Sequence, residues 1–362
     1  MLRILIISVG KMSGGIEKYT VTLGKLLEKE RMKVYYVVRK GGWLEGQLHE
    51  KNVLHVEMGK HIISDVFRIR RFAQKNKINI VHCNSNNGLL MAILVTENRD
   101  RKKIGVIHGD VKVDQAQKGI FIVSLYSKLE KWLLNMTCSK CVAVSQSMKN
   151  ILKEHGVKES KISVIYNGIQ HWDYVKTPDY YATPLKICTV GNLVAVKNHI
   201  ALLEALLVLK RQYAYVNVLV DIYGEGPLRV ELDSFIRENG LENVRLKGFT
   251  DKVRERLNQY VLYVHPSNYE SFGISIVEAM QAGCCVIAND VGGIKEIIQD
   301  ENGYLVDCNQ IDELANRIAY CYMKRDELKQ KAIKGKRKSE ENFTDIIMMK
   351  RVLELYHEVN GK

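Results

Sequence analysis

The stretch VLYVHPSNYESFGISIVEAMQAGCCVIAND, residues 261–290, is typical of one unit of a parallel α/β sheet. Its first seven residues are apolar and β-rich, which predicts a buried strand. From Gly273 the apolar residues recur at helical spacing, and Gly283 ends that helix before a second strand at 284–290. A strand–loop–helix–strand unit of this kind builds a parallel sheet with helices on its faces.

Two glutamates in this stretch, Glu270 and Glu278, are the first candidate site residues. Glu270 falls in the loop at the carboxyl end of the first strand, and Glu278 falls about one turn into the helix. Parallel sheets bind ligands at that edge, where the helix N-terminus also attracts phosphate. Both acids could therefore face one ligand. The spacing is equally compatible with Glu270 acting on the helix terminus and Glu278 being solvated.

Composition limits the class of protein. A chain of 362 residues is too long for one ordinary core, so we expect two domains. No apolar run reaches membrane-spanning length, and the start MLRILIISVG is too short and too strand-like for a signal peptide. The CxxC pair Cys138 and Cys141 lacks the second pair or histidine of a zinc finger. We therefore expect reduced thiols in a cytoplasmic protein.

The positive charge lies in the first half of the chain. Residues 1–182 hold 30 lysines and arginines against 16 aspartates and glutamates, a net charge of +14. The rest of the chain has a net charge of −1, which gives the total of +13. Such a half attracts phosphate-rich partners, namely an anionic membrane, a phosphorylated acceptor or nucleic acid. Because no nucleic-acid-binding motif accompanies the charge, we expect no nucleic-acid partner.

Two α/β series follow each other along the chain. The first series has predicted strands at 2–8, 33–39, 78–83, 103–109, 140–145 and 161–168. The second has predicted strands at 185–192, 216–226, 244–250, 261–267, 284–290 and 303–307. Helical patterns separate the strands in both series, which is the order of a doubly wound fold.

The domain prediction follows from these series. We predict two doubly wound, Rossmann-like domains facing a central cleft, an N-terminal domain over 1–170 and a C-terminal domain over 185–343. Residues 171–184 form the linker, because they have no clean period and hold two of the four prolines. The final helix, within 344–362, has no strand partner, and we expect it to pack on the first domain.

Three further loops at predicted strand ends carry candidate residues. SGGIE (13–17) holds Gly15 at a helix start, where backbone N–H groups can approach an anion, although a tight turn explains the glycines as well. His108 directly follows a strand and suits either a sugar hydroxyl or a structural role. Lys197 can place its charge on a diphosphate or be an ordinary surface lysine.

Other reaction classes lack their sequence motifs. The chain has no GxxxxGK[ST] phosphate loop, no HExxH and no GxSxG. It also lacks the GxGxxG dinucleotide motif, and it has no Asp-x-Asp pair. We therefore expect no cofactor, no metal ligands and no obligate divalent metal.

Taken together, the chain resembles the retaining, GT-B-fold glycosyltransferases of family 4, also called group 1. The resemblance runs through most of the chain and is strongest over 185–307. It rests on five stretches, which are GGIE, VSQSMKNIL…VIYNGI, VGNLVAVKNHIALLEAL, IYGEGP and HPSNYESFGISIVEAMQAGCCVIANDVGGIKEII. The last of these is similar to the family's E-x7-E signature almost position by position.

The resemblance implies catalytic roles for three residues. Glu270 contacts the donor sugar near its reacting centre, and Lys197 neutralises charge that develops on the leaving phosphate. His108 lies beside the donor sugar and orients it.

The resemblance also implies that the N-terminal domain binds the acceptor and that the C-terminal domain binds the nucleotide sugar through a set of contacts. Glu278 holds the ribose hydroxyls, which suits an ionised carboxylate, and Gly273 and Ile274 present backbone amides to the diphosphate. Gly15 does the same from the N-terminal domain. Asn192 stands where the family has a phosphate-binding arginine, so the phosphate contacts rest on Lys197 and amides or include another basic residue such as Arg229.

The function implied is a metal-independent hexosyltransferase that moves a sugar, with retention, from a nucleotide-diphosphate sugar such as a UDP-sugar to a sugar or lipid-linked acceptor. Bacterial envelope polysaccharide or glycolipid synthesis would suit it. Two alternatives stay open. One is a weakly active or inactive nucleotide-sugar-binding partner subunit, which Asn192 motivates, and the other is a nucleotide-sugar epimerase of similar fold.

Two basic helical stretches predict attachment to the inner face of the cell membrane. Residues 118–136 interleave apolar residues with lysines, and residues 65–77 add arginines and lysines. An anionic lipid surface attracts such helices, which would make the enzyme cytoplasmic and peripheral. The alternative is that the apolar residues pack on the sheet and the lysines are solvated.

Overall fold

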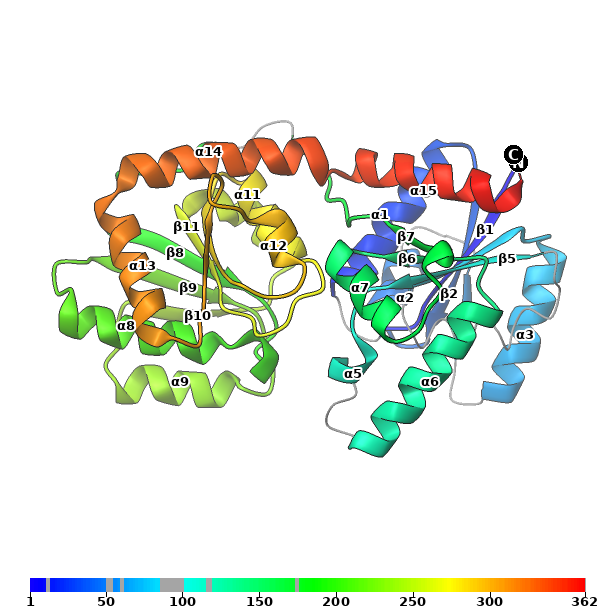
Figure 1. The fold of residues 1–362 in the computed structure, drawn as a ribbon, viewed down its shortest axis with the longest axis horizontal. Helices are drawn as coiled ribbons and strands as arrows, with labels where there is room; N and C mark the ends of the chain where they lie inside the picture. Colours follow the sequence, from blue (N-terminus) through cyan, green and yellow to red (C-terminus); the bar gives the residue numbers. More distant parts are fainter. Residues whose placement is uncertain are drawn as a thin grey trace. The chain divides into compact units, whose positions relative to one another are not determined.

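The computed structural model describes residues 1–10, 14–49, 55–58, 62–84, 101–114, 119–172 and 176–361. The chain divides into two compact units. Unit 1 comprises Met1–Gln170 and Asp345–Lys362, and unit 2 comprises His171–Thr344. Each unit is a parallel sheet with helices on its faces (Figure 1), which confirms the prediction of two doubly wound, Rossmann-like domains. Part of the predicted linker, 173–175, lies outside the described residues.

In the sheet of unit 1, β1 lies between β2 and β4. In order across the sheet, its strands are β3 (His55–Met58), β2 (Lys33–Arg39), β1 (Arg3–Ser8), β4 (Ile80–Asn84), β5 (Lys102–Ile107), β6 (Lys140–Ala143) and β7 (Ile162–Val164). The chain leaves β1 toward β2 on one side and returns to β4 on the other, so the strand order reverses between β1 and β4.

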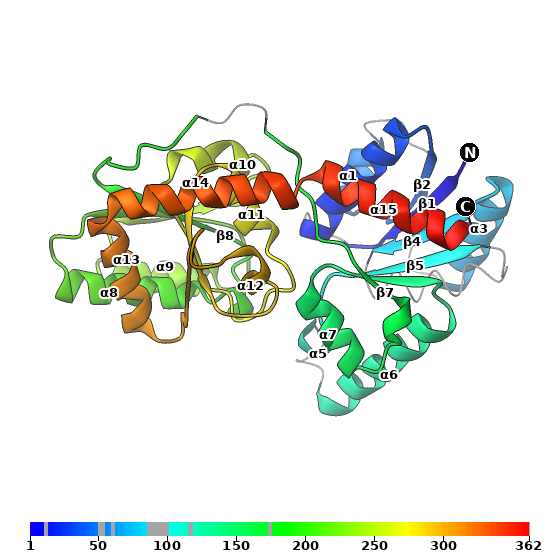
Figure 2. The ribbon, with the colours of Figure 1, turned by 45° about the horizontal axis from the view of Figure 1, so that its top comes forward.

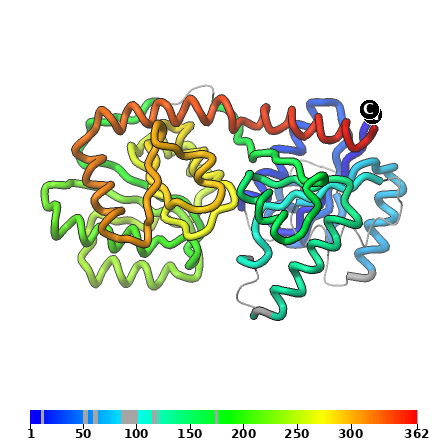
Figure 3. Tube along the Cα trace, in the orientation of Figure 1, coloured from blue at the N-terminus to red at the C-terminus, as the bar shows by residue number. Residues whose placement is uncertain are grey.

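Helices surround this sheet in unit 1. They are α1 (Gly15–Lys29), α2 (Trp43–His49), α3 (Ile62–Lys75), α5 (Val111–Asp114), α6 (Ile120–Met136), α7 (Gln146–Glu154) and α15 (Asp345–Asn360). The last helix packs against α1, and the hydroxyl of buried Tyr356 lies 2.8 Å from His82 Nδ1 on β4. The two chain termini consequently lie close together in unit 1 (Figures 2 and 3).

The sheet of unit 2 repeats the same strand order. Its strands are β10 (Val244–Gly248), β9 (Val218–Tyr223), β8 (Leu185–Val190), β11 (Leu262–His265), β12 (Cys285–Asn289) and β13 (Tyr304–Val306). Every residue of β11 and β12 is buried, as expected for central parallel strands covered on both faces. The order reverses between β8 and β11, and the crevice outside such a reversal is where doubly wound sheets bind ligands.

The helices of unit 2 are α8 (His199–Gln212), α9 (Arg229–Glu238), α10 (Val253–Arg256), α11 (Ile274–Gln281), α12 (Ile294–Ile297), α13 (Ile311–Met323) and α14 (Arg325–Asn342). The sequence did not predict α14, which packs against α11. Among the described residues, no helix is both long enough and apolar enough to span a membrane.

Candidate functional site

The carboxylate of Glu270 is the centre of a buried polar network in unit 2. Its Oε2 lies 2.5 Å from Lys197 Nζ and accepts a hydrogen bond of 3.1 Å from His265 Nε2. Burial acts to raise the pKa of Glu270, but the His265 hydrogen bond and the nearby Lys197 charge lower it to about 2. Glu270 is therefore ionised at neutral pH and held by two partners. The alternative in which Glu270 acts only on the helix terminus does not account for its contacts with Lys197 and His265.

Lys197 and Glu270 come from the two loops at the strand-order reversal. Lys197 ends a short 3-10 turn, Ala195–Lys197, after β8, and Glu270 follows β11. Backbone bonds join the loops, since Asn268 N–H donates to Val196 O over 2.8 Å. The switch point of the sheet thus carries a fixed ion pair at the place where ligands bind.

His265 is a site residue that the sequence reasoning missed. It is the last residue of β11 and is buried, and burial lowers the pKa of its ring despite the neighbouring Glu270. A neutral ring that donates its Nε2–H to Glu270 presents Nδ1 as an acceptor, and the hydroxyl of Tyr263 lies 3.3 Å away. The available signal was a histidine at a predicted strand end, five positions before Glu270.

Two glycines shape the loop that supports Glu270. Gly293 N–H donates to Glu270 O over 3.0 Å. A Cβ at Gly292 would lie 2.1 Å from the same oxygen, and the residue has a φ of +52°. The stretch VGG (291–293) therefore has glycine at these positions because the backbone of Glu270 packs directly against it.

Helix α11 begins beside this network. Its N-cap is Gly273, with φ 111° and ψ 57°, a conformation that favours glycine, and no side chain caps it. The first N–H groups of a helix lack partners within the helix and carry its positive dipole end. Ile274 and the residues after it therefore offer a binding site for an anion.

Glu278 is half-buried in the second turn of α11. Burial and the negative charge of Glu278 both raise the pKa of Tyr263. Glu278 therefore lies near the Tyr263 hydroxyl, which is 3.3 Å from His265 Nδ1. This position does not fit the alternative in which Glu278 is fully solvated. The structure thus places both glutamates of the opening stretch around the same strand end.

Asn192 and Arg229 lie at the neighbouring loops. Asn192 is exposed, and Arg229 forms a 2.8 Å ion pair with Glu225 in which both side chains are partly exposed. A Cβ at Gly224 would lie 1.9 Å from Gly191 O, so the glycine turn of IYGEGP packs against the Asn192 loop. Arg229 therefore lies near the Asn192 loop, and its charge is paired with that of Glu225.

The candidates of unit 1 have a different environment. Gly15 is the exposed first residue of α1, while Glu17 in the same turn is buried with its pKa raised by burial. A Cβ at Gly10 would lie 1.8 Å from Glu17 Oε1, which explains one glycine of this loop by close packing. His108 follows β5, and burial lowers its pKa to about 4, so the ring is neutral. Ser13 lies outside the described residues.

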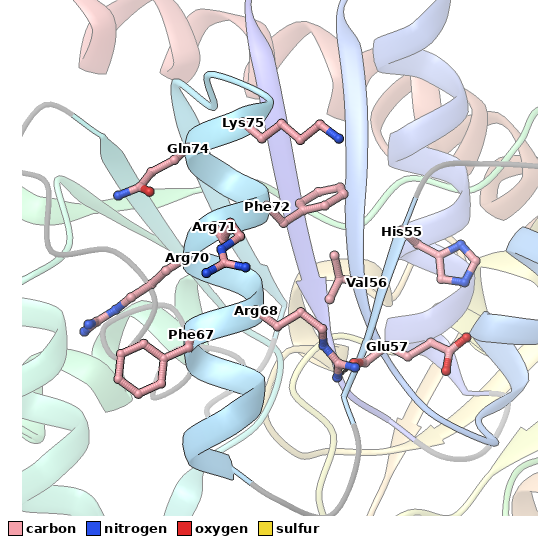
Figure 4. Close-up of a pocket in the computed structure, with 10 residues that line it drawn as sticks. All are labelled: His55, Val56, Glu57, Phe67, Arg68, Arg70, Arg71, Phe72, Gln74 and Lys75. Carbon is pink, nitrogen blue, oxygen red and sulfur yellow. Dashed lines mark hydrogen bonds between the residues drawn. The ribbon is translucent and has the colours of Figure 1, made fainter.

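A cavity of about 950 Å³ lies beside β3 and α3 in unit 1 (Figure 4). Its lining includes the cationic side chains of Arg68, Arg70, Arg71 and Lys75. The aromatic ring of Phe67 on the same helix is 63% exposed. The basic stretch predicted at 65–77 therefore forms a positively charged surface on α3.

Two family profiles match the sequence. The family described as "Glycosyl transferases group 1" matches residues 172–339, and "Glycosyltransferase Family 4" matches residues 13–172. The matches together run through both units.

Two curated relatives are 28% and 25% identical to the chain over their aligned residues. The chain is 28% identical over 260 residues to a poly(ribitol-phosphate) alpha-N-acetylglucosaminyltransferase of Staphylococcus aureus, covering 70% of this chain and 50% of the relative. It is 25% identical to the Escherichia coli O-antigen biosynthesis glycosyltransferase WbnH, covering 89% and 90%. The chain spans about half the length of the first curated relatives it matches.

The fold has close counterparts among solved structures. HepE of Anabaena, solved in complex with UDP and glucose, superposes with a TM-score of 0.86 at 20% identity, covering 98% of this chain and 99% of HepE. A glycosyltransferase of Rickettsia africae superposes with a TM-score of 0.81 at 22% identity, covering 99% and 98%. Both likenesses concern the fold.

Proposed function

The chain belongs to the group 1, or family 4, glycosyltransferases, and from that premise we propose that it moves a sugar from a nucleotide-diphosphate sugar to an acceptor with retention at the anomeric carbon. The observation that carries the proposal is the half-buried Lys197–Glu270 ion pair at the switch point of unit 2, beside the N-terminus of α11. An anionic ligand with a sugar attached matches a lysine, a helix N-terminus and a carboxylate in one place.

Lys197 acts on the leaving group in this proposal. The bond between the anomeric carbon and the terminal phosphate oxygen breaks, and negative charge grows on the diphosphate. The Lys197 ammonium and the first amides of α11, at Gly273 and Ile274, stabilise that charge. The acceptor oxygen bonds to the same face of the carbon, and its proton passes to the leaving phosphate oxygen. No metal is required for this charge balance.

Glu270 holds the donor sugar. Lys197 and His265 both contact its Oε2, and we assign Oε1 to a hydroxyl of the sugar. An ionised carboxylate is a strong acceptor for a hydroxyl, and the two fixed partners keep it in one orientation.

Glu278 and Asn192 complete the nucleotide contacts. Glu278 accepts hydrogen bonds from the ribose hydroxyls, and Asn192 lies at the phosphate loop where it supplies no charge. Gly15 and His108 lie in unit 1, and their predicted contacts with the donor stay predictions.

The relatives support the donor and the pathway. HepE was solved with UDP and glucose, which supports a UDP-sugar as the first donor to test. The Staphylococcus aureus and Escherichia coli relatives are named for poly(ribitol-phosphate) and O-antigen, which supports an envelope polysaccharide or glycolipid as the acceptor.

Incubation with single nucleotide sugars tests the activity. An active transferase releases the nucleoside diphosphate slowly even without an acceptor, because a water molecule takes the place of the acceptor. An inactive partner subunit would bind the donor without release, and an epimerase would convert its sugar without release. Either of these two results with every donor would overturn the proposal.

Helix α6 supports peripheral attachment to an anionic membrane. Phe121, Leu125, Trp132 and Met136 are 54–85% exposed, and Lys128 and Lys131 are exposed between them. Packing on the sheet accounts for Leu133 and Leu134, which are buried, but not for the exposed residues. We propose that this face, with the basic α3, contacts the lipid surface at the inner face of the cell membrane. Lys118 lies outside the described residues.

Sedimentation with lipid vesicles tests the membrane contact. The protein should bind anionic vesicles at low salt, bind neutral vesicles less, and dissociate as salt rises. The double change of Phe121 and Trp132 to serine should weaken binding, while Val230→Ser, an equally exposed residue of unit 2, should not. Equal binding to neutral vesicles, or no binding at low salt, would exclude this contact.

A further inference from the structure

Four potential metal ligands in unit 1 come from two short elements that follow each other in the chain. Helix α2 carries Glu45 and His49, four positions apart and so on one helix face. Strand β3 carries His55 and Glu57, two positions apart and so on one strand face. Figure 4 shows His55 and Glu57 on the same side of β3, pointing away from α3. The pattern E-x3-H then H-x-E thus gathers two carboxylates and two imidazoles at the sheet edge.

The distances fit a small coordination sphere. The ligand atoms of His49, His55 and Glu57 all lie within 4.8 Å of one another. His49 Nε2 is 3.3 Å from Glu57 Oε1 and 3.8 Å from Glu45 Oε1. Two ligand atoms bound tetrahedrally to one Zn²⁺ at ~2.0–2.1 Å are about 3.3–3.4 Å apart. The same 3.3 Å contact is also a hydrogen bond between the His49 and Glu57 side chains.

The neighbouring groups orient the two carboxylates. Gly41 N–H donates to Glu45 Oε2 over 2.5 Å, and Lys40 Nζ lies 3.8 Å from Glu57 Oε2. Both contacts use the second oxygen of each carboxylate, so each Oε1 is directed toward His49. Partners behind the ligands that fix their orientation are a general feature of metal sites.

We propose that His49, His55 and Glu57, with Glu45 beside His49, bind one divalent transition-metal ion, for which Zn²⁺ is the best match. Imidazole and carboxylate ligands together suit Zn²⁺, whereas Mg²⁺ and Ca²⁺ prefer oxygen ligands alone. The ion fastens the end of α2 to β3, the edge strand of the sheet. The site belongs to unit 1 and the Lys197–Glu270 pair belongs to unit 2, so the proposal does not rest on sugar transfer. The expected metal independence of the transfer is compatible with it.

Zinc titration of the intact, chelator-treated protein is the first test. Calorimetry should show saturation at one equivalent of Zn²⁺. The melting temperature should rise until that equivalent is reached and fall back when EDTA is added. Mg²⁺ should have no such effect. Absence of saturable Zn²⁺ binding would overturn the proposal.

Matched variants locate the ion. His49→Gln and Glu57→Gln should each weaken Zn²⁺ binding at least tenfold, while His357→Gln, at an exposed histidine of α15, should leave it unchanged. The side chain of His49 is 60% exposed, so its replacement leaves the core intact. Co²⁺ bound in place of zinc should give a spectrum of nitrogen and oxygen ligands. Unchanged affinity in both variants, or a thiolate band from the buried cysteines, would contradict the site.

Discussion

At the carboxyl edges of the two sheets, the pKa shifts favour the charged form of Glu270 in unit 2 and the neutral forms of His108 and Glu17 in unit 1. In unit 2, Glu270 is ionised with its pKa at about 2, because His265 and Lys197 outweigh the effect of burial. In unit 1, burial lowers the pKa of His108 to about 4 and raises that of Glu17. Burial therefore acts on both edges, and in unit 2 the His265 hydrogen bond and the Lys197 charge outweigh it and keep Glu270 ionised.

The difference indicates which ligand each edge suits. The two sheets share the same strand order, so topology alone does not distinguish them. A fixed ion pair beside a helix N-terminus suits a diphosphate whose charge grows during the reaction. The neutral ring of His108 suits hydroxyl groups, which need hydrogen bonds rather than charge. The predictions below test whether Lys197 and Glu270 give the edge of unit 2 its charge.

Lys197→Ala should have the largest effect. Loss of one group that stabilises developing charge costs about 2.7–4 kcal/mol, or roughly 10²–10³-fold in kcat. The KM for the donor should change less, because the charge is needed most as the bond breaks. Steady-state kinetics of donor turnover measure both constants. Lys295→Ala, which removes an exposed lysine paired with Asp290 in the same unit, is the control, and a normal kcat in Lys197→Ala would rule out this role.

Stability against pH should show opposite slopes for Glu270 and Glu17. The folded pKa of Glu270, about 2, is below its ordinary value of 4.5. Its contribution, on the order of 3 kcal/mol, is present above pH 4.5 and is lost as the pH falls toward 2. The folded pKa of Glu17 is raised, so its contribution is present at low pH and lost as the pH rises above 4.5.

Chemical denaturation between pH 3 and 7 measures these slopes. The stability of the wild type relative to Glu270→Gln should rise with pH, and its stability relative to Glu17→Gln should fall. Slopes of the same sign would mean that the two sheet edges do not differ in charge as described.

Glu278→Ala should weaken binding of the free nucleoside diphosphate. Each hydrogen bond to a charged acceptor is worth about 1.5–3 kcal/mol, so the Kd should rise by roughly 10–150-fold. Calorimetric titration measures it, with Glu301→Ala, an exposed glutamate of the same unit, as the control. If affinity were the same as in the wild type, Glu278 would have no contact with the nucleotide.

Asn192→Arg should have the smallest effect, in the opposite direction. Asn192 is exposed, so an arginine fits without displacing the core. An added charge near the diphosphate should tighten binding a few-fold, about 1 kcal/mol. The same titration applies. Weaker binding would show that another group, such as Arg229, already contacts that phosphate.

The sequence was most informative where side chains are large and buried. The strands around 261–290 and the helix between them were predicted because apolar residues fill most of their buried positions. Helix α14 was missed because its buried residues, Leu328, Ala332, Gly335 and Ser339, are mostly small or polar. Strand β3 was missed because it has four residues, of which only Val56 is buried.

The site was predicted less completely than the fold. Lys197 and Glu270 were both named from their motifs, but their contact joins residues 73 positions apart and required the structure. His265 was missed because a histidine in a buried strand has no sequence pattern that separates a functional ring from a core ring. The His49–Glu57 cluster was missed because neither α2 nor β3 was predicted.

Thermal unfolding of the intact protein with a panel of ligands tests the central claim most directly, namely that the charged edge of unit 2 binds the diphosphate of a nucleotide sugar. The panel holds nucleoside diphosphates, nucleotide sugars, nucleosides and free sugars. The account predicts that one nucleotide series stabilises the protein, by about 2.7 kcal/mol at a concentration of 100 times its Kd, and that nucleosides and free sugars do not. Stabilisation by free sugars alone, or by no nucleotide at all, would contradict it.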